Sequence, residues 1–361
     1  MRKIRLRLKK RSYDIIVGCN IIGKLGEHVR KLDIGTNAYI ITNPLIKRKF
    51  GKLIEATLTK YAIKTRFKTV TDSEKSKSVE TAAGVLKDLA AYDIKKRVFI
   101  VALGGGVVGD LAGFVASVYK RGIPYIQIPT TLLAQVDSAI GGKTAVDLSS
   151  GKNLIGAIYQ PKLVLSDVSF LKSLSPRQIR AGLAEVIKYG IIKDPALVTL
   201  LENKLDDILQ CKPAALEYVV SRCAKIKADI VSRDEKEELG LRTILNFGHT
   251  AGHAIETACG YKLLNHGEAV ALGMLIACGI SRRSGLIGQS EEKRIEGLIR
   301  NAGLPIRIKG ISIERVISAQ NHDKKFLGEK NRFVLIKGIG KTQIAKNIPL
   351  KIIKDSIRER F

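Results

Sequence analysis

Three of the five histidines in this chain, His249, His253 and His266, lie close together in the sequence. His249 and His253 are four residues apart in a helical pattern, so both imidazoles face one side of a helix at a spacing that allows a shared metal ion. Glu185 lies in an otherwise apolar helical segment, where an unpaired carboxylate is costly, and it is a candidate oxygen ligand. The cluster predicts a metal site, and spacing alone selects His249 and His253 as the pair. The alternative is that each histidine is a structural residue.

A glycine-rich turn offers a second chemistry. Gly104, Gly106 and Gly109 match G-x-G-x-x-G between an apolar strand pattern and the helical pattern LAGFVASV. Such glycines let backbone amides approach a pyrophosphate at a helix N-terminus. The acidic residue usually found about 20 residues later is missing, so another group must hold the ribose. The turn predicts a dinucleotide site; a tight turn without a ligand is the alternative.

A second glycine pair, in Gly141-Gly142-Lys143-Thr144, is not a P-loop, because Asp137 stands where the first glycine of that motif belongs. The surrounding segment, 129–156, is nevertheless long and polar, which is typical of a functional loop. Lys143, Lys152 and Asn153 are candidate donors to a phosphate or carboxylate there. Solvated loop side chains are the alternative interpretation.

These residues must be positioned by two kinds of structure. The first half alternates strand and helix patterns, which indicates a parallel sheet covered by helices, and from Ser175 onward the pattern is mainly helical. We therefore predict an α/β Rossmann-like parallel-sheet domain at residues 1–174 and a mostly α-helical domain at 175–361. An amphipathic strand and hairpin are expected at the N-terminus. Further strands are expected at 38–41, 63–67, 98–103, 125–128 and 163–165, and a helix at 79–91.

Composition bounds the class of protein. With 45% hydrophobic and 27% charged residues the chain is typical of a soluble globular protein, and its longest apolar run, 269–280, is too short to cross a membrane. Five scattered cysteines and the absence of a signal-peptide pattern predict a cytoplasmic protein with reduced thiols. The net charge of +28 fits a nucleic-acid binder, but the basic residues are spread along the chain and Trp is absent. We therefore expect no nucleic-acid partner, and the charge itself is unexplained.

Over nearly its full length the sequence resembles the 3-dehydroquinate synthases. The shared segments are GGGVVGDLAGFVAS, RGIPYIQIPTTLLAQVDSAIGGKTAVD, GKNLIGAIYQP, GLAEVIKYG, RTILNFGHTAGHAIE, HGEAVALGM and a late DKK. The resemblance implies an NAD-binding domain and a helical metal-binding domain with the active site between them. It also implies conversion of 3-deoxy-D-arabino-heptulosonate 7-phosphate to 3-dehydroquinate and phosphate in the shikimate pathway. The resemblance further implies that NAD is reduced and reoxidised within each turnover and that the departing phosphate acts as a base.

The resemblance assigns cofactor residues position by position. Its metal ligands, for zinc or cobalt, fall on Glu185, His249 and His266, so it replaces the spacing-based pair and moves His253 to the substrate phosphate. Glu74 becomes the candidate ribose contact, although Ser73 stands where the family usually has Gly. The implied NAD contacts are Asp72, Ser73, Glu74, Lys75, Ser76, Lys77, Gly105, Gly106, Val107, Val108, Gly109, Asp110, Thr130, Thr131, Leu133, Asp137, Lys143, Lys152, Phe170, Leu171, Lys172 and Ser173.

The implied substrate residues are mostly cationic or amide groups, as a substrate with both phosphate and carboxylate requires. They are Arg121, Lys143, Asn153, Lys188, Lys227, Glu238, Arg242, Asn246, His253 and Lys324. A longer segment before Gly240 leaves the choice between Glu237 and Glu238 open. Where the family usually has a serine after Ser138, this chain has Ala139.

Other classes of protein remain as alternatives to this interpretation. Sister sugar-phosphate cyclases differ at positions matching Lys227, Asn246, His253 or Lys324, each of which has the dehydroquinate-type residue here. A polyol dehydrogenase would release reduced cofactor and would not need so many phosphate donors. A basic nucleic-acid-binding protein with this fold is the alternative from a different class. The resemblance also implies a homodimer, with Arg121 reaching the neighbouring site.

Overall fold

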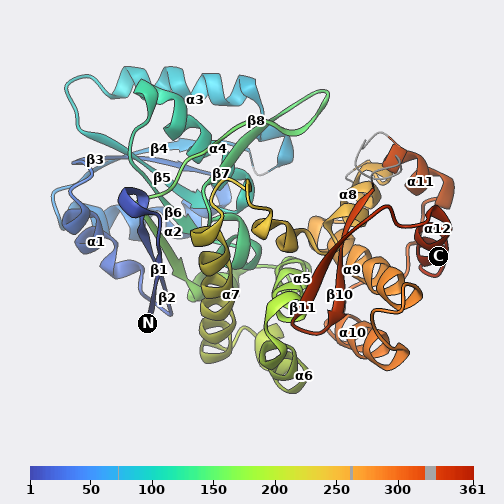
Figure 1. The fold of residues 1–361 in the computed structure, drawn as a ribbon. Coiled ribbons are helices and arrows are strands. Elements are labelled where there is room, and N and C mark those ends of the chain that lie inside the picture. Colours follow the sequence, from blue (N-terminus) through green and yellow to red (C-terminus); the bar gives the residue numbers. More distant parts are fainter. Residues whose placement is uncertain (72, 261–262, 322–330) are drawn as a thin grey trace. The chain divides into compact units, whose positions relative to one another are not determined.

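The chain forms two compact units in a computed structural model that describes residues 1–71, 73–260, 263–321 and 331–361. The first unit comprises Met1–Leu174 and Leu216–Lys236, and the second comprises Ser175–Ala215 and Glu237–Phe361 (Figure 1). Asp72 and Lys324, both predicted site residues, lie outside the described residues.

A seven-stranded sheet organises the first unit, with strand order β1-β2-β9-β6-β5-β3-β4. β1 and β2 form an antiparallel hairpin, and the other neighbouring strands are parallel. The predicted N-terminal hairpin and the five predicted strands are therefore confirmed. The strands are β1 (Arg2–Leu6), β2 (Tyr13–Gly18), β3 (Asn37–Thr42), β4 (Lys64–Thr69), β5 (Val98–Gly104), β6 (Tyr125–Pro129) and β9 (Leu163–Asp167).

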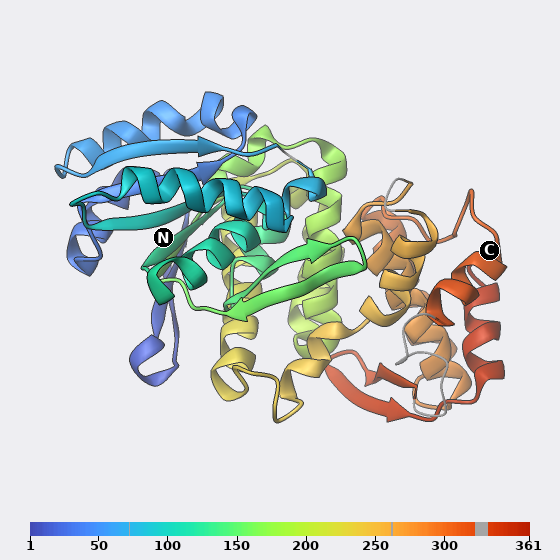
Figure 2. The ribbon, with the colours of Figure 1, turned by 90° about the horizontal axis from the view of Figure 1, so that it is seen from above.

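Helices cover both faces of this sheet, which explains why its central strands are apolar runs without alternation. Ile40 and Val101 pack on one face against α1 (Leu25–Leu32) and α2 (Pro44–Thr59). Ile41 and Ile100 pack on the other face against α3 (Val79–Tyr92) and α4 (Gly106–Val118), which lie together in Figures 1 and 2. The Rossmann-like architecture predicted from the sequence is confirmed.

The prediction of a long loop at 129–156 was wrong in part, because much of this segment forms regular secondary structure. It contains the π-helical turn η5 (Ala134–Ser138) and a separate hairpin of β7 (Lys143–Leu148) and β8 (Gly151–Ile158). Gly141 and Gly142 have φ of 99° and 71° and lead into strand β7 rather than a helix, which agrees with the rejection of a P-loop. The first unit's short turns are η1 (Lys9–Arg11), η2 (Ile22–Lys24), η3 (Glu74–Ser76), η4 (Tyr119–Arg121) and η6 (Val168–Ser173).

The second unit is mostly helical, as predicted. Buried residues run through α9 (His266–Arg283), so the apolar run at 269–280 is a core helix. The small sheet of β10 (Arg332–Gly338) and β11 (Lys341–Lys346) was not predicted. The remaining elements are α5 (Pro176–Lys193), α6 (Pro195–Leu209), η7 (Leu241–Asn246), α8 (His249–Ala258), α10 (Gln289–Asn301), α11 (Ile313–Asn321) and α12 (Leu350–Arg358).

One long helix, α7 (Pro213–Arg233), runs from the second unit's part of the sequence into the first unit. Its residues from Leu216 onward pack with the sheet unit, whereas the predicted domains, 1–174 and 175–361, are continuous in sequence. Assigning NAD binding to the first range and metal binding to the second stays a prediction. Within the described residues, no helix is long and apolar enough to cross a membrane.

Candidate functional site

Three helices of the second unit carry the predicted metal ligands. Glu185 lies in the middle of α5, which begins at a capping box of Ser175 and Gln178. His249 is the first residue of α8, and His266 is the first residue of α9, where Asn265 caps the helix. Both imidazoles therefore extend from the N-terminal ends of helices, and at α9 the cap by Asn265 holds that end in place.

The three side chains converge on one point. Nε2 of His249 and Nε2 of His266 each lie 3.5 Å from Oε1 of Glu185. One ligand atom from each residue lies within 4.8 Å of the other two. Glu185 is fully buried, and both histidines are partly buried. Two imidazoles and one carboxylate in this arrangement can bind a divalent ion and leave coordination positions for substrate.

The second nitrogen of each imidazole has an acceptor. Nδ1 of His249 lies 3.3 Å from the carbonyl oxygen of Phe247, and Nδ1 of His266 lies 3.5 Å from Oε1 of Glu256. An Nδ1–H that donates to these oxygens leaves Nε2 of both rings as the lone-pair nitrogen, facing Glu185. The donor set therefore fits a zinc- or cobalt-type ion.

The surroundings shift the pKa values of His249 and His266 in opposite directions. Burial, followed by the charge of Lys188, lowers the pKa of His249 to about 3. Burial also disfavours the charged form of His266, but hydrogen bonds to Glu185 and Glu256 prevail and raise its pKa to about 10. Lys188, buried on α5, forms an ion pair with Glu185. Metal binding at Nε2 of His266 therefore competes with protonation of that ring.

His253 lies beside Glu185, His249 and His266 but is not one of the three converging ligands. It is exposed, and its ring centroid is 5.4 Å from that of His249. His253, Glu256 and His266 form a second possible ligand group. The structure thus brings together the set implied by the resemblance, and also places the spacing-based pair on neighbouring turns of α8. The assignment of ligands stays a prediction.

The predicted NAD residues gather at one edge of the first unit's sheet. Most of them follow the carboxyl ends of β4, β5, β6 and β9, where open parallel sheets bind ligands, whereas Lys143 and Lys152 lie on the β7–β8 hairpin. β5 ends at Gly104 and α4 begins at Gly106, as the glycine motif predicted. A Cβ on Gly109 would lie 2.9 Å from Oε1 of Gln127, so this glycine permits close packing of α4 on β6.

Ion pairs and hydrogen bonds connect these loops. Nζ of Lys77 lies 2.6 Å from Oδ2 of Asp110, and Lys77 also bonds to Asn153. Although burial acts against it, Asp110 raises the pKa of Lys77, which keeps this lysine charged. Lys152 lies 3.3 Å from Glu74, so the β7–β8 hairpin joins the segment predicted to contact the ribose.

Some predicted NAD residues have buried side chains. Val108 and Thr130 are 1% exposed, and Phe170 stacks on Phe50 with ring centroids 4.2 Å apart. Leu171 is also in the core. Any nucleotide contact at these positions would therefore involve the backbone. The other described candidates are partly or fully exposed apart from Ser76, Lys77 and Gly109.

The predicted substrate residues divide between the two units. In the first unit, Arg121 is exposed with φ of 62°, and Nζ of Lys227 on α7 lies 2.8 Å from Oδ1 of Asp137. In the second unit, Arg242 is buried within η7, whereas Asn246 is exposed at the end of that turn. Glu238 is exposed, and Glu237 is partly buried with φ of 63°.

Glu256 was not among the predicted site residues. It is 7% exposed and lies on α8, one turn after His253. Its place in the segment GHAIE, at helical spacing from His253, was the available signal. Only the fold shows that it faces His266.

Matches to family models decide the family. Residues 67–181 match the model described as 3-dehydroquinate synthase N-terminal, and residues 182–326 match 3-dehydroquinate synthase C-terminal. The chain belongs to the 3-dehydroquinate synthase family. It is 45% identical to a 3-dehydroquinate synthase of Caldanaerobacter subterraneus subsp. tengcongensis, over 98% of this chain and 100% of the relative.

Solved structures outside the 3-dehydroquinate synthases share this fold. A 2-deoxy-scyllo-inosose synthase, in complex with carbaglucose-6-phosphate, NAD+ and Co2+, has a TM-score of 0.91, with 27% identity and complete coverage of both chains. A 2-epi-5-epi-valiolone synthase of Streptomyces hygroscopicus subsp. jinggangensis, with NAD+ and Zn2+ bound, has a TM-score of 0.88 and 27% identity, over 98% of this chain and 99% of that one. The 3-dehydroquinate synthase family is thus related to other synthases that bind NAD and a divalent metal.

Proposed function

We propose that this chain converts 3-deoxy-D-arabino-heptulosonate 7-phosphate to 3-dehydroquinate and phosphate, with NAD and a divalent metal, in the shikimate pathway. The observation that carries the proposal is the convergence of both Nε2 atoms of His249 and His266 on Glu185, in a chain of this family. The proposed ligands are those three residues, with zinc or cobalt as the ion.

The proposed roles follow from the chemistry of each side chain. When bound, NAD would supply a reversible hydride acceptor, and a divalent metal would supply a Lewis acid for the substrate hydroxyl. Glu185 and the neutral Nε2 atoms of His249 and His266 supply the donor atoms for that ion. The segment around Glu74, together with the glycine turn at 105–110, would hold the nucleotide at the sheet edge.

Cationic and amide side chains would bind the substrate's two anionic groups. We assign Lys188, Arg242, Asn246 and His253 in the second unit and Lys143, Asn153 and Lys227 in the first, with Arg121 and Lys324. Charge-assisted donors of this kind orient phosphate and stabilise negative charge as the phosphate leaves. Either Glu237 or Glu238 would be the site carboxylate.

The comparisons favour this substrate over those of the sister synthases. Identity is 45% to a 3-dehydroquinate synthase and 27% to the two other synthases. We further propose a homodimer that acts in the cytoplasm, which agrees with five cysteines that form no disulfide in the structure. The division into an NAD-binding range, 1–174, and a metal- and substrate-binding range, 175–361, is part of the same proposal.

The reaction can be tested by following two products at once. Purified protein with NAD and zinc or cobalt should release phosphate from the heptulosonate phosphate without accumulation of NADH, because each turnover returns the hydride. Phosphate is measured colorimetrically and NADH by absorbance. Removal of the metal with a chelator should abolish release, and re-addition should restore it.

Three outcomes separate the alternatives. Folded, metal-loaded protein that releases no phosphate contradicts the proposal. Stoichiometric NADH accumulation with a polyol would instead indicate a dehydrogenase. Turnover of another sugar phosphate, in place of the heptulosonate phosphate, would indicate a sister cyclase.

A further inference from the structure

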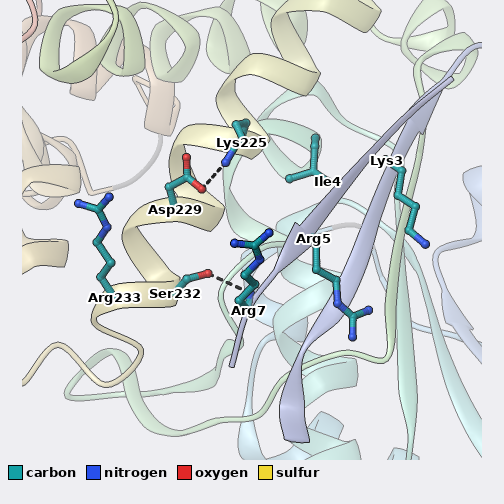
Figure 3. A pocket seen from close by; sticks show the side chains of 8 residues that line it. All are labelled: Lys3, Ile4, Arg5, Arg7, Lys225, Asp229, Ser232 and Arg233. Carbon is teal, nitrogen blue, oxygen red and sulfur yellow. Dashed lines mark hydrogen bonds and ion pairs between the residues drawn. The ribbon is translucent and has the colours of Figure 1, made fainter. Parts of the chain in front are cut away.

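A basic cavity of about 450 Å³ lies in the first unit between strand β1 and helix α7 (Figure 3). Its cationic lining residues are Lys3, Arg5 and Arg7 from β1 and the chain just after it, with Lys225 and Arg233 from α7. Ile4, Asp229 and Ser232 complete the lining.

The positive charge of the cavity is only partly balanced. Lys3 and Arg5 each lie 2.9 Å from a carboxylate oxygen of Asp14, and Lys225 lies 2.5 Å from Asp229. Within the described part of the chain, no carboxylate pairs with Arg7 or Arg233. Both of these arginines are exposed, so their guanidinium groups are available to a ligand.

Local geometry holds the two elements together. The backbone amide of Arg7 donates to Oγ of Ser232 at 3.0 Å, which fixes the chain after β1 against α7. In Figure 3, Arg7 lies between the labelled residues of the strand and those of the helix. The anchoring is made by the backbone, so the side chain of Arg7 is not needed for it.

Protection of the sheet explains only part of this arrangement. β1 is the end strand of the sheet, and cationic side chains on an end strand discourage pairing with other chains. That role accounts for Lys3 and Arg5 but gives no reason for Arg233 on α7. Cations from two separate elements that surround one cavity are typical of an anion site.

We propose that this cavity binds a small anion that carries phosphate groups. Guanidinium groups form two parallel hydrogen bonds with phosphate oxygens, and Arg7 and Arg233 are the groups available to do so. The cavity volume falls in the range of small-molecule sites, roughly 300–1,000 Å³, which favours a metabolite over a polymer. The site lies on the same helix as Lys227 and is distinct from the proposed substrate residues.

Orthophosphate is the probe, with binding measured by titration calorimetry on the protein loaded with NAD and metal. Wild-type protein should bind orthophosphate. The affinity should fall about tenfold or more in the double variant Arg7→Ala/Arg233→Ala, because each substitution removes charge-assisted hydrogen bonds to the anion. Added NaCl should weaken that event in the wild type. The matched control is Arg48→Ala, which removes an exposed arginine of α2 outside this cavity and should change nothing.

A second variant separates this cavity from the proposed substrate site. His253→Ala should leave the Arg7/Arg233-dependent event intact. Orthophosphate affinity that is unchanged in the double variant overturns the proposal. So does preferential binding of a single-stranded oligonucleotide that is lost in the double variant, because it would indicate a nucleic-acid surface.

A second inference concerns Glu256 and rests on the proposed metal site. Imidazole Nδ1 of His266 faces Oε1 of Glu256, while its Nε2 faces Oε1 of Glu185, both at 3.5 Å. Glu256 is buried and reaches His266 from α8, a different helix from the one that carries His266. We infer that Glu256 is a positioning residue: it accepts the Nδ1–H of His266, fixes the ring and directs the Nε2 lone pair toward the metal.

Metal affinity, rather than turnover, tests this role. Glu256→Ala should weaken zinc binding about 10- to 100-fold in a competition with a chromophoric chelator, as loss of such outer partners does elsewhere. Glu256→Gln keeps an acceptor oxygen and should recover part of the affinity. The matched control is Glu292→Gln, which alters another buried carboxylate of the second unit and should leave zinc affinity unchanged.

The two failures are distinguishable. If wild-type protein does not bind zinc, the proposed metal site is wrong. If wild-type protein and Glu256→Ala bind zinc equally while both remain folded by circular dichroism, the metal site stands and the positioning role is wrong.

Discussion

Glu185→Gln and His249→Ala are each expected to give folded protein without bound metal, whereas His253→Ala should retain metal and lose turnover. His249→Ala removes a donor atom that lies 3.5 Å from Glu185, and Glu185→Gln replaces an anionic carboxylate by a neutral amide, a much weaker ligand for a divalent ion, so neither site can hold a catalytic ion tightly. His253 is exposed and lies beside the cluster, where we assign it to the substrate phosphate. Metal content after dialysis, measured by mass spectrometry, and phosphate release are the two readouts.

Gln is chosen at position 185 for a structural reason. Glu185 is paired with the buried Lys188, and a small substituent would leave a buried charge with its carboxylate removed and a cavity beside it. Gln keeps the volume and can still accept a hydrogen bond. Stoichiometric metal in either Glu185→Gln or His249→Ala, or its loss in His253→Ala, would show that the ligand assignment is wrong.

The helical spacing of His249 and His253 illustrates what sequence can and cannot predict. It correctly predicted that both residues lie on one helix, because four residues make about one turn. It could not predict that His266 faces His249, with ring centroids 5.3 Å apart, because that contact depends on how α9 packs on α8. Local pattern fixes a side chain's place on its own helix, and tertiary packing decides which helices meet.

The fold shows the same division. Buried strands such as β5 were predictable, because an apolar run ending in glycines leaves few other structures open. The β7–β8 hairpin was missed because the apolar residues of β8, Leu154, Ile155 and Ile158, are largely exposed and do not alternate with polar ones. Likewise the sequence of α7 has the pattern of an ordinary amphipathic helix, and nothing in it indicates that the helix packs with the first unit.

Gly273→Ala is expected to destabilise the second unit by roughly 3 kcal/mol and to lower metal affinity as well. A Cβ at this position of α9 would overlap the carbonyl oxygen of Gly248 and lie 2.7 Å from the amide nitrogen of Gly252. Both contacts are backbone atoms of the segment that carries His249, so the added methyl must push α8 away from α9. Because ligand distances must be held to about 0.2 Å, the separation of His249 from His266 would weaken the site.

Urea unfolding and zinc competition measure the two effects, and Gly297→Ala is the matched control. Gly297 lies inside α10, where a Cβ would project into open space, so alanine there should stabilise the helix by about 0.5–1 kcal/mol and leave zinc affinity unchanged. If Gly273→Ala unfolds at the wild-type urea concentration, α8 and α9 are not held in the close contact that the structure describes. If it is destabilised but binds zinc normally, the ligands tolerate movement of α8, and the contact contributes to stability alone.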